Sequence, residues 1–423
     1  MIEIPKVERE NAILIGLATR EVSKDKVQEH LDELEMLADT AGANTVFKIM
    51  QDKSKPDSAF YIGKGKAEEV AELAELNNIN LIIFDDDLNP TQVRNLEKLF
   101  NKKIIDRSGL ILDIFASHAR TREAKVQVEL AQLQYTLPRL TRAWTHLSKQ
   151  YGGIGTKGPG ETQIETDRRI IRDRIAKLKD KLEKIEQQQK TKSSGRKDFL
   201  KASMVGYTNA GKSTLINFLT GAGVLAENKL FATLDSTTRS FEIEQDKKIL
   251  ISDTVGFIRK LPHHLVASFK STLNVVRDAD LILHVIDAAH PSFEDHIEVV
   301  DATLKELGAD KKTQIKIFNK VDLITDKSKF DYVLNNYENA ILISAEKGIN
   351  IGKLKEMLLN IYEKNFVVHN VEVKNYDSKV ISQIHTMADV VDVKYNDDLV
   401  YITFRADKQT VNKINNLIKE VKN

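Results

Sequence analysis

A glycine-rich octapeptide near the middle of the sequence limits the possible folds more than any other stretch. It fits the pattern G-x-x-x-x-G-K-[ST], with Gly206, Tyr207, Thr208, Asn209, Ala210, Gly211, Lys212 and Ser213, followed by Thr214. An apolar strand is expected before it, over residues 202–205, and a helix after it, over residues 213–219. In that context the backbone N–H groups and the helix N-terminus hold phosphates. We expect Lys212 to neutralise the β- and γ-phosphates and the Ser213 hydroxyl to bind Mg²⁺.

A second motif follows a predicted strand over residues 248–252. It consists of Asp253, Thr254, Val255 and Gly256. A carboxylate at a strand end downstream of a P-loop is placed to organise Mg²⁺ through water, so we expect that role for Asp253. The backbone N–H of Gly256 is expected to sense the γ-phosphate.

Two further motifs at predicted strand ends are expected to recognise the purine base of the nucleotide. They are Asn319, Lys320, Val321 and Asp322 after residues 314–318, and Ser344, Ala345 and Glu346 after residues 340–343. The Asp322 carboxylate can accept hydrogen bonds from the guanine N1–H and 2-amino group, whereas adenine would leave it buried and unpaired. The Lys320 stem can lie over the base, and backbone N–H groups at Ser344 and Ala345 can reach guanine O6. The four motifs together predict a GTP site.

The segment between the P-loop helix and the next strand is where a switch loop must lie. It contains Phe231, Ala232, Thr233, Leu234 and Asp235. We expect the Thr233 hydroxyl to complete the Mg²⁺ shell only while the γ-phosphate is present, although spacing alone leaves Thr237 and Thr238 open. Catalysis is then expected to depend on Lys212, Thr233 and Gly256.

Phe257 follows Gly256, where many signalling GTPases place a glutamine that orients water. Phenylalanine cannot do this by hydrogen bonding. We therefore expect slow basal hydrolysis that a partner accelerates by ordering the switch loops.

The rest of the chain predicts three more parts around this GTPase domain, which we place at residues 199–365. Residues 1–115 alternate strand and helix patterns, which is typical of a parallel α/β domain. Residues 116–198 contain two heptad seams separated by a glycine-rich stretch, which predicts an antiparallel helical hairpin with a loop at its tip. Residues 187–197 are polar and predict a linker. Residues 366–423 predict a small α+β domain.

Charge is concentrated in the hairpin. Residues 139–201 hold 17 Lys and Arg against 8 Asp and Glu, a balance of +9, so the rest of this +1 chain is near −8. Such a segment indicates contact with a polyanion, and a solvated helix face is the alternative.

With these motifs, the sequence closely resembles the HflX family of translation-associated bacterial GTPases over nearly its whole length. The most specific stretches are residues 206–214, 231–239, 253–257 and 153–168, which read GIGTKGPGETQIETDR. Residues 106–116, 129–140 and 261–273 also match, and residues 151–153 depart slightly from the family's run of glycines. The resemblance implies a Ras-like, mostly parallel sheet in the GTPase domain.

The resemblance also implies a partner, the large ribosomal subunit and its rRNA, and the splitting of stalled or idle ribosomes under stress. The basic hairpin is a plausible probe into rRNA, with phosphate contacts expected from Lys149, Lys157, Arg168, Arg169, Arg172 and Arg174. The alternative is a regulatory GTP switch that acts through a protein effector, with RNA binding incidental. Deleting residues 150–160 should ruin ribosome splitting only in the first case.

Several other classes of site are excluded or disfavoured. The chain has no cysteine, which excludes disulfides and thiolate zinc sites. No stretch approaches the ~18 apolar residues of a membrane span, so we expect a cytoplasmic protein without integral membrane contact. We also expect a monomer that does not bind DNA. Residues 63–66 (GKGK) could hold ATP, but we favour an ordinary loop before a helix. The acidic run Asp85, Asp86 and Asp87 is expected to be a solvated loop.

Overall fold

The computed structural model describes residues 9–143, 159–193, 199–221, 230–231, 237–244, 247–260, 270–396, 398–406 and 408–422. The chain divides into two compact units. The first comprises Met1–Glu186, Ala226–Asp235 and Val255–Thr272, and the second comprises Gln187–Leu225, Ser236–Thr254 and Leu273–Asn423. The first unit therefore includes parts of both switch segments.

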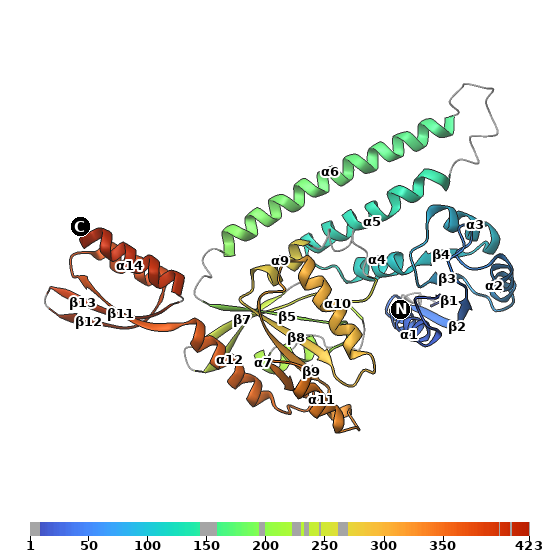
Figure 1. The fold of residues 1–423 in the computed structure, drawn as a ribbon. Coiled ribbons are helices and arrows are strands. Elements are labelled where there is room, and N and C mark those ends of the chain that lie inside the picture. Colours follow the sequence, from blue (N-terminus) through green and yellow to red (C-terminus); the bar gives the residue numbers. More distant parts are fainter. Residues whose placement is uncertain are drawn as a thin grey trace, which may run out of the picture. The chain divides into compact units, whose positions relative to one another are not determined.

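The N-terminal part is a four-stranded parallel sheet in the order β2-β1-β3-β4 (Figure 1). Its strands are β1 (Glu10–Ala18), β2 (Ala43–Asp52), β3 (Leu81–Phe84) and β4 (Lys103–Asp106). Its helices are α1 (Lys24–Thr40), α2 (Lys64–Leu76), α3 (Pro90–Phe100) and α4 (Arg107–His118). Apolar residues of α2 and α3 pack with Ile13 and Ile15 of β1 in one core. The predicted parallel α/β fold is confirmed.

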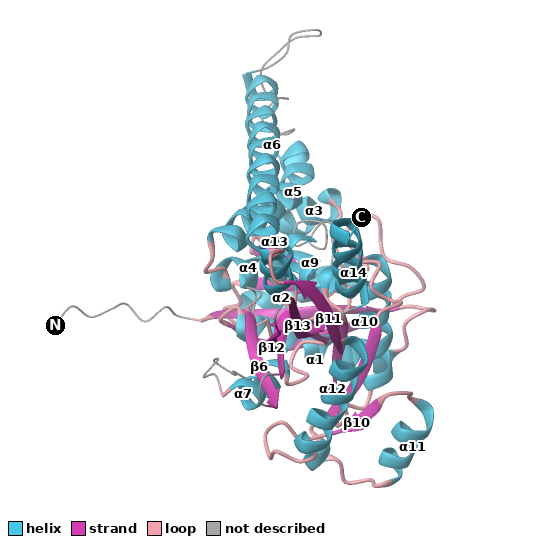
Figure 2. Cartoon of the chain, turned by 90° about the vertical axis from the view of Figure 1, so that its left-hand side faces the viewer, coloured by secondary structure: helices cyan, strands magenta, loops and turns pink. Residues whose placement is uncertain are grey.

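Two long helices form the predicted hairpin. They are α5 (Arg122–Ala143) and α6 (Pro159–Ser193), which lie side by side in Figures 1 and 2. Leu130 of α5 and Leu178 of α6 share a buried apolar cluster with Val126, which is the heptad seam that the sequence predicts. The prediction of a linker over residues 187–197 is wrong in part, because α6 continues to Ser193 despite its polar composition. Glutamine and lysine are good helix formers, and hence polarity alone does not end a helix.

The GTPase part is a six-stranded sheet in the order β10-β9-β8-β5-β7-β6, parallel except for the β6–β7 pair. The strands are β5 (Leu200–Gly206), β6 (Thr238–Glu244), β7 (Lys247–Asp253), β8 (Leu281–Asp287), β9 (Thr313–Asn319) and β10 (Ala340–Leu342). The helices are α7 (Lys212–Thr220), α9 (Lys270–Asp278), α10 (Phe293–Glu306), α11 (Ser328–Asn336) and α12 (Ile351–Asn365), with a short 3-10 helix η2 (Val321–Leu323).

Helices cover both faces of this sheet. Val285 and Ile317 pack in a core with α7 and α12, whereas their chain neighbours Ile286 and Phe318 pack with α10 and α11. Successive side chains of a strand point to opposite faces, so the two cores lie on opposite sides. The carboxyl ends of β5, β8 and β9 therefore form one rigid edge, which is where ligands bind in open α/β sheets.

The C-terminal part is a three-stranded antiparallel sheet, β11-β13-β12, with two helices. Its elements are β11 (Val367–Lys374), α13 (Ser378–Met387), β12 (Asp389–Asn396), β13 (Leu399–Ala406) and α14 (Lys408–Lys422). This confirms the predicted α+β class, while the three boundaries between the four domains stay predictions. Among the described residues no helix has both the length and the apolar character needed to span a bilayer.

Candidate nucleotide-binding site

The glycine-rich octapeptide forms a tight loop between β5 and α7, at positions that require glycine. Gly206 has φ +156° and Gly211 has φ +94°. A Cβ atom on Gly206 would lie 2.2 Å from the carbonyl oxygen of Val285, and one on Gly211 would lie 2.2 Å from Nδ2 of Asn319. The loop therefore sits directly against β8 and the end of β9, and any larger residue would push these backbones apart.

Lys212 begins α7 and points back over the loop. Its ammonium group donates hydrogen bonds to the carbonyl oxygens of Gly206 (3.0 Å) and Tyr207 (2.8 Å). The residue is buried, and this burial lowers its pKa to about 8 although the nearby Asp253 carboxylate acts in the opposite direction. A charge held here without a full counterion is suited to binding a polyanion.

Asp253 ends β7 as a buried carboxylate. Its Oδ1 accepts the backbone N–H of Thr254 at 3.0 Å, and the Thr254 hydroxyl donates to the carbonyl oxygen of Met204 in β5 at 2.7 Å. Asp253 thus has a fixed orientation beside the loop. Carboxylate and hydroxyl oxygens are hard donors that suit Mg²⁺, and the pair of Asp253 and Ser213, in the first turn of α7, fits this ion.

Asn319 connects the phosphate loop to the last motif. It is buried at the end of β9, where its Nδ2 donates to the carbonyl oxygen of Ala210 and its Oδ1 accepts the N–H of Ala345, both at 2.9 Å. One side chain therefore holds the octapeptide, the β9 end and the loop after β10 together. The sequence placed these motifs at strand ends but did not predict this bridge.

The remaining base-motif residues line the same edge. Lys320 has φ +62°, and its ammonium group pairs with Asp287 at the end of β8, 2.6 Å away. Asp322 is exposed in η2, and Glu346 is exposed as well. Ser344 is buried, with its hydroxyl accepting the N–H of Lys347. The Asp322 carboxylate is therefore free to meet a ligand from solvent, as base recognition needs.

Comparisons with known proteins agree with this geometry. Family models described as GTP-binding GTPase N-terminal, GTP-binding GTPase Middle Region and 50S ribosome-binding GTPase match residues 28–116, 118–196 and 201–320. The GTPase HflX of Flavobacterium psychrophilum is 45% identical over 390 residues, 87% of this chain and 94% of that protein. The chain belongs to the HflX family of GTPases.

Other HflX relatives show the same extent of similarity. The GTPase HflX of Escherichia coli is 42% identical over 384 residues, which cover 89% of each protein. Among solved structures, a GTP-binding protein from the hyperthermophilic archaeon Sulfolobus solfataricus in complex with GDP is 25% identical, with a TM-score of 0.45, and the match covers 84% of this chain and 99% of that one. As a member of this family, the chain is a GTP-binding GTPase.

The switch segments of this HflX GTPase are described in part. Ala232, Thr233, Leu234 and Asp235 lie outside the described residues, so Thr233 stays a prediction. Its rival Thr238 lies in β6, where its hydroxyl is hydrogen-bonded to Ser252 at 2.8 Å, which disfavours a role in binding metal. In the second switch, Val255 and Phe257 are buried. Phe257 occupies the chain position after Gly256, where many signalling GTPases have a glutamine that orients water.

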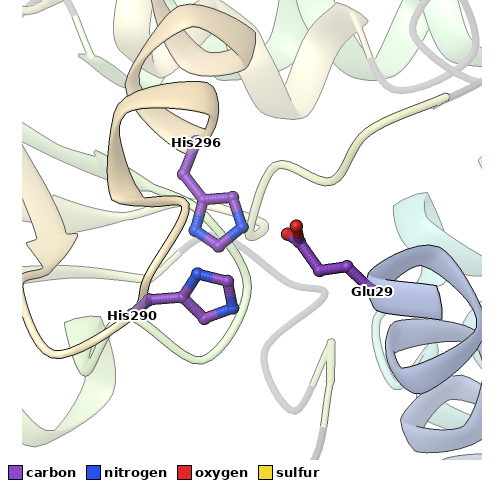
Figure 3. A group of neighbouring side chains, drawn as sticks. All are labelled: Glu29, His290 and His296. Carbon is purple, nitrogen blue, oxygen red and sulfur yellow. The ribbon is translucent and has the colours of Figure 1, made fainter. Parts of the chain in front are cut away.

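An aromatic stack that the sequence did not predict lies under the octapeptide. The Tyr207 ring stacks on His296 of α10 with centroids 3.7 Å apart and planes at 6°. His290 lies beside His296, with ring centroids 4.3 Å apart (Figure 3). The stack fixes the Tyr207 side chain and hence the second residue of the phosphate loop.

The predicted RNA contacts divide into three groups. Lys149 and Lys157 lie outside the described residues. Arg169 and Arg172 are exposed on α6 and Arg168 is half-buried. Arg174 forms an ion pair with Glu129 of α5 at 2.6 Å and therefore also contributes to the hairpin itself.

Proposed function

We propose that the edge formed by β5, β8, β9 and the loop after β10 binds Mg²⁺-GTP. The observation that carries this proposal is the Asn319 bridge, because it brings three of the four motifs to one rigid edge. The octapeptide N–H groups and Lys212 hold the phosphates. Ser213 and Thr233 bind Mg²⁺ directly and Asp253 does so through water.

Base selection is proposed to come from Asp322, whose exposed carboxylate accepts two hydrogen bonds from guanine. Lys320 covers the base with its stem, and Asp287 holds its ammonium group in place. Replacing Asp322 with Asn removes two charge-assisted hydrogen bonds, each of about 1.5 kcal/mol, so the Kd for GDP should rise about 100-fold. The amide can donate to the 2-oxo group of xanthine, and xanthosine diphosphate should bind more tightly than GDP. Calorimetry showing unchanged GDP affinity would rule this assignment out.

We further propose that the large ribosomal subunit is the partner and that the chain splits stalled or hibernating ribosomes under stress. Two features support this: the family model described as a 50S ribosome-binding GTPase, and the hairpin with its balance of +9. The exposed Arg169 and Arg172 lie in the N-terminal half of α6, the half that begins beside the glycine-rich stretch, and exposed arginines suit phosphate contacts.

The direct test is a sucrose gradient of purified 70S ribosomes mixed with the protein. With a non-hydrolysable GTP analogue we expect 70S particles to separate into subunits, with the protein migrating with the 50S fraction. With GDP the 70S peak should persist. Intact 70S ribosomes with bound protein in both samples would refute splitting while leaving ribosome binding in place.

The hairpin can be tested separately. The double variant Arg168→Glu with Arg169→Glu should lose co-sedimentation with ribosomes and keep GDP affinity. The control variant reverses the charge of Lys179 and Lys184 by changing both to Glu. These residues are exposed on the same helix and lie at least 10 residues, or about 15 Å, farther from the tip. The control should keep most of its ribosome binding. Equal losses in both variants would indicate a diffuse charge effect instead of tip contacts.

A further inference from the structure

Two stretches that carry the family resemblance, residues 106–116 and 129–140, meet within the first compact unit. The first stretch covers most of α4 and the second lies in α5 (Figure 1). The two helices approach so closely that only glycine fits at Gly109. A Cβ atom there would lie 2.5 Å from Oη of Tyr135 and 2.8 Å from Cγ1 of Ile105. The N-terminal domain and α5 are therefore packed tightly against each other at this point.

Asp106 is the polar centre of this contact. It is the N-cap of α4, its side chain is fully buried, and its Oδ1 accepts the N–H of Gly109 at 2.9 Å. The same oxygen accepts the Tyr135 hydroxyl at 2.7 Å, while Oδ2 accepts the N–H of Leu88 at 3.0 Å and the guanidinium group of Arg139. Arg139 also donates to the Tyr135 hydroxyl oxygen. One buried carboxylate thus holds two side chains of α5.

The N-terminal domain in turn holds the start of α4 firmly. Arg107, the residue after Asp106, is buried and pairs with Asp85 at 2.6 Å. Asp85 is only 2% exposed, so the prediction that the acidic run after β3 is a solvated loop is wrong for this residue. Separating a buried ion pair is strongly unfavourable, and hence Asp106 is attached to a rigid part of the fold.

The two side chains that Asp106 holds lie on either side of a proline. Pro138 is inside α5, with Tyr135 before it and Arg139 directly after it. Proline lacks the N–H that bonds to the carbonyl four residues back, and its ring crowds that carbonyl, so α-helices weaken and bend at proline. Because both side chains are bonded to one rigid carboxylate, the two parts of α5 cannot tilt against each other without breaking one of these bonds.

We propose that Asp106, Tyr135 and Arg139 form a clamp that stiffens α5 across Pro138, and that they are positioning residues for ribosome splitting. A helix that bends freely at Pro138 would let the part of the hairpin beyond it take many directions. Ordering that part on binding costs conformational entropy, and a stiff helix has paid this cost in advance. Contacts suffice to bind one subunit, whereas displacing a second subunit also requires that the arm resists bending. The role in splitting rests on the proposed function, and the clamp itself does not.

The test uses full-length variants that keep the fold. Arg139→Met removes the cation and leaves the Asp106 carboxylate with its three other donors. In sucrose gradients of 70S ribosomes with a non-hydrolysable GTP analogue, the split fraction should fall about fivefold, while the Kd for 50S subunits changes less than about twofold. Hydrogen exchange in residues 134–143 of α5 should become about tenfold faster, because a charge-assisted hydrogen bond is lost.

Pro138→Ala is the second change that decides the mechanism. It restores the helical N–H at the weak point, so Arg139→Met combined with Pro138→Ala should regain most of the splitting and the slow exchange. Asp106→Asn keeps a good helix N-cap and the charge of Arg139, and it should show the same defect and the same recovery. Direct contact of Arg139 with RNA would give the opposite pattern, in which Asp106→Asn stays active and Pro138→Ala restores nothing.

The control is Arg122→Met, the same substitution at an exposed position at the start of α5, which should leave both measurements unchanged. Normal splitting by Arg139→Met, or a loss that Pro138→Ala does not restore, would overturn the proposal. Failure of the unmodified protein to split ribosomes would instead refute the proposed function. The exchange measurement would then still decide whether the clamp exists, because unchanged exchange in Arg139→Met would exclude it.

Discussion

Replacing Asn319 with Ala removes both halves of the bridge between the phosphate loop and the loop after β10. The substitution leaves two buried groups without partners, the carbonyl oxygen of Ala210 and the N–H of Ala345. An unsatisfied buried polar group costs about 1–3 kcal/mol, so the expected loss of stability is about 2–6 kcal/mol, at the lower end if water enters the vacated space.

The loss should appear in two measurements. Urea unfolding, monitored by the hydrogen exchange of amides in β9 and α7, reports the stability of the GTPase sheet itself. It does not require that the whole chain unfolds in one step. Equilibrium titration with a fluorescent GDP analogue reports the site. The Kd should rise at least tenfold, because the loop and the base motif are no longer held in register.

Asn336→Ala is the matched control. Asn336 makes one hydrogen bond, to the carbonyl oxygen of Tyr332, and is exposed on α11, so its loss should change stability by less than about 0.5 kcal/mol. If Asn319→Ala stays within 0.5 kcal/mol and twofold in Kd of the unmodified protein, the bridge does not hold the site together and the argument fails.

Three further predictions follow from single contacts. Gly206→Ala should destabilise the GTPase sheet by about 2–4 kcal/mol, because the new Cβ would meet the Val285 carbonyl oxygen. Its control is Gly352→Ala in α12, where a Cβ meets nothing within 4 Å. Thermal unfolding should show that this second change stabilises the protein by up to about 1 kcal/mol. Burial lowers the pKa of Lys212 to about 8, and phosphate binding raises it because the bound phosphates favour the charged ammonium group. The Kd for GDP should therefore stay constant below pH 7 and rise as the pH passes 8, by at most tenfold per pH unit. In calorimetry, Lys212→Ala should abolish this pH dependence. Leu178→Ala should destabilise the helical hairpin by about 2–5 kcal/mol and increase hydrogen exchange in α5, and equal protection in both proteins would contradict a packed seam.

Much of the fold was predictable because it follows from local patterns of apolar and polar residues. The alternation of apolar strands and amphipathic helices predicted both α/β sheets, and the heptad spacing predicted which faces of α5 and α6 meet. The sequence patterns did not predict α4, because its apolar run from Leu110 to Phe115 is interrupted only by Asp113. A short apolar run of this kind cannot be assigned to a helix or a strand by periodicity alone. The polar composition of residues 187–197 also predicts a linker, whereas α6 continues to Ser193.

The sequence by itself determined the chemistry of the site. A glycine with positive φ, a lysine at a helix start and a carboxylate after a strand are requirements of phosphate and base recognition, and they are visible as residue types at fixed spacing. Only the tertiary structure decided which distant residues complete that chemistry. Asn319 reaches Ala210 across 109 positions and Arg259 reaches Glu33 across 226. Such pairs have no local pattern, because an ion pair or buried hydrogen bond depends on distance in space, and only the packing of sheets and helices sets that distance.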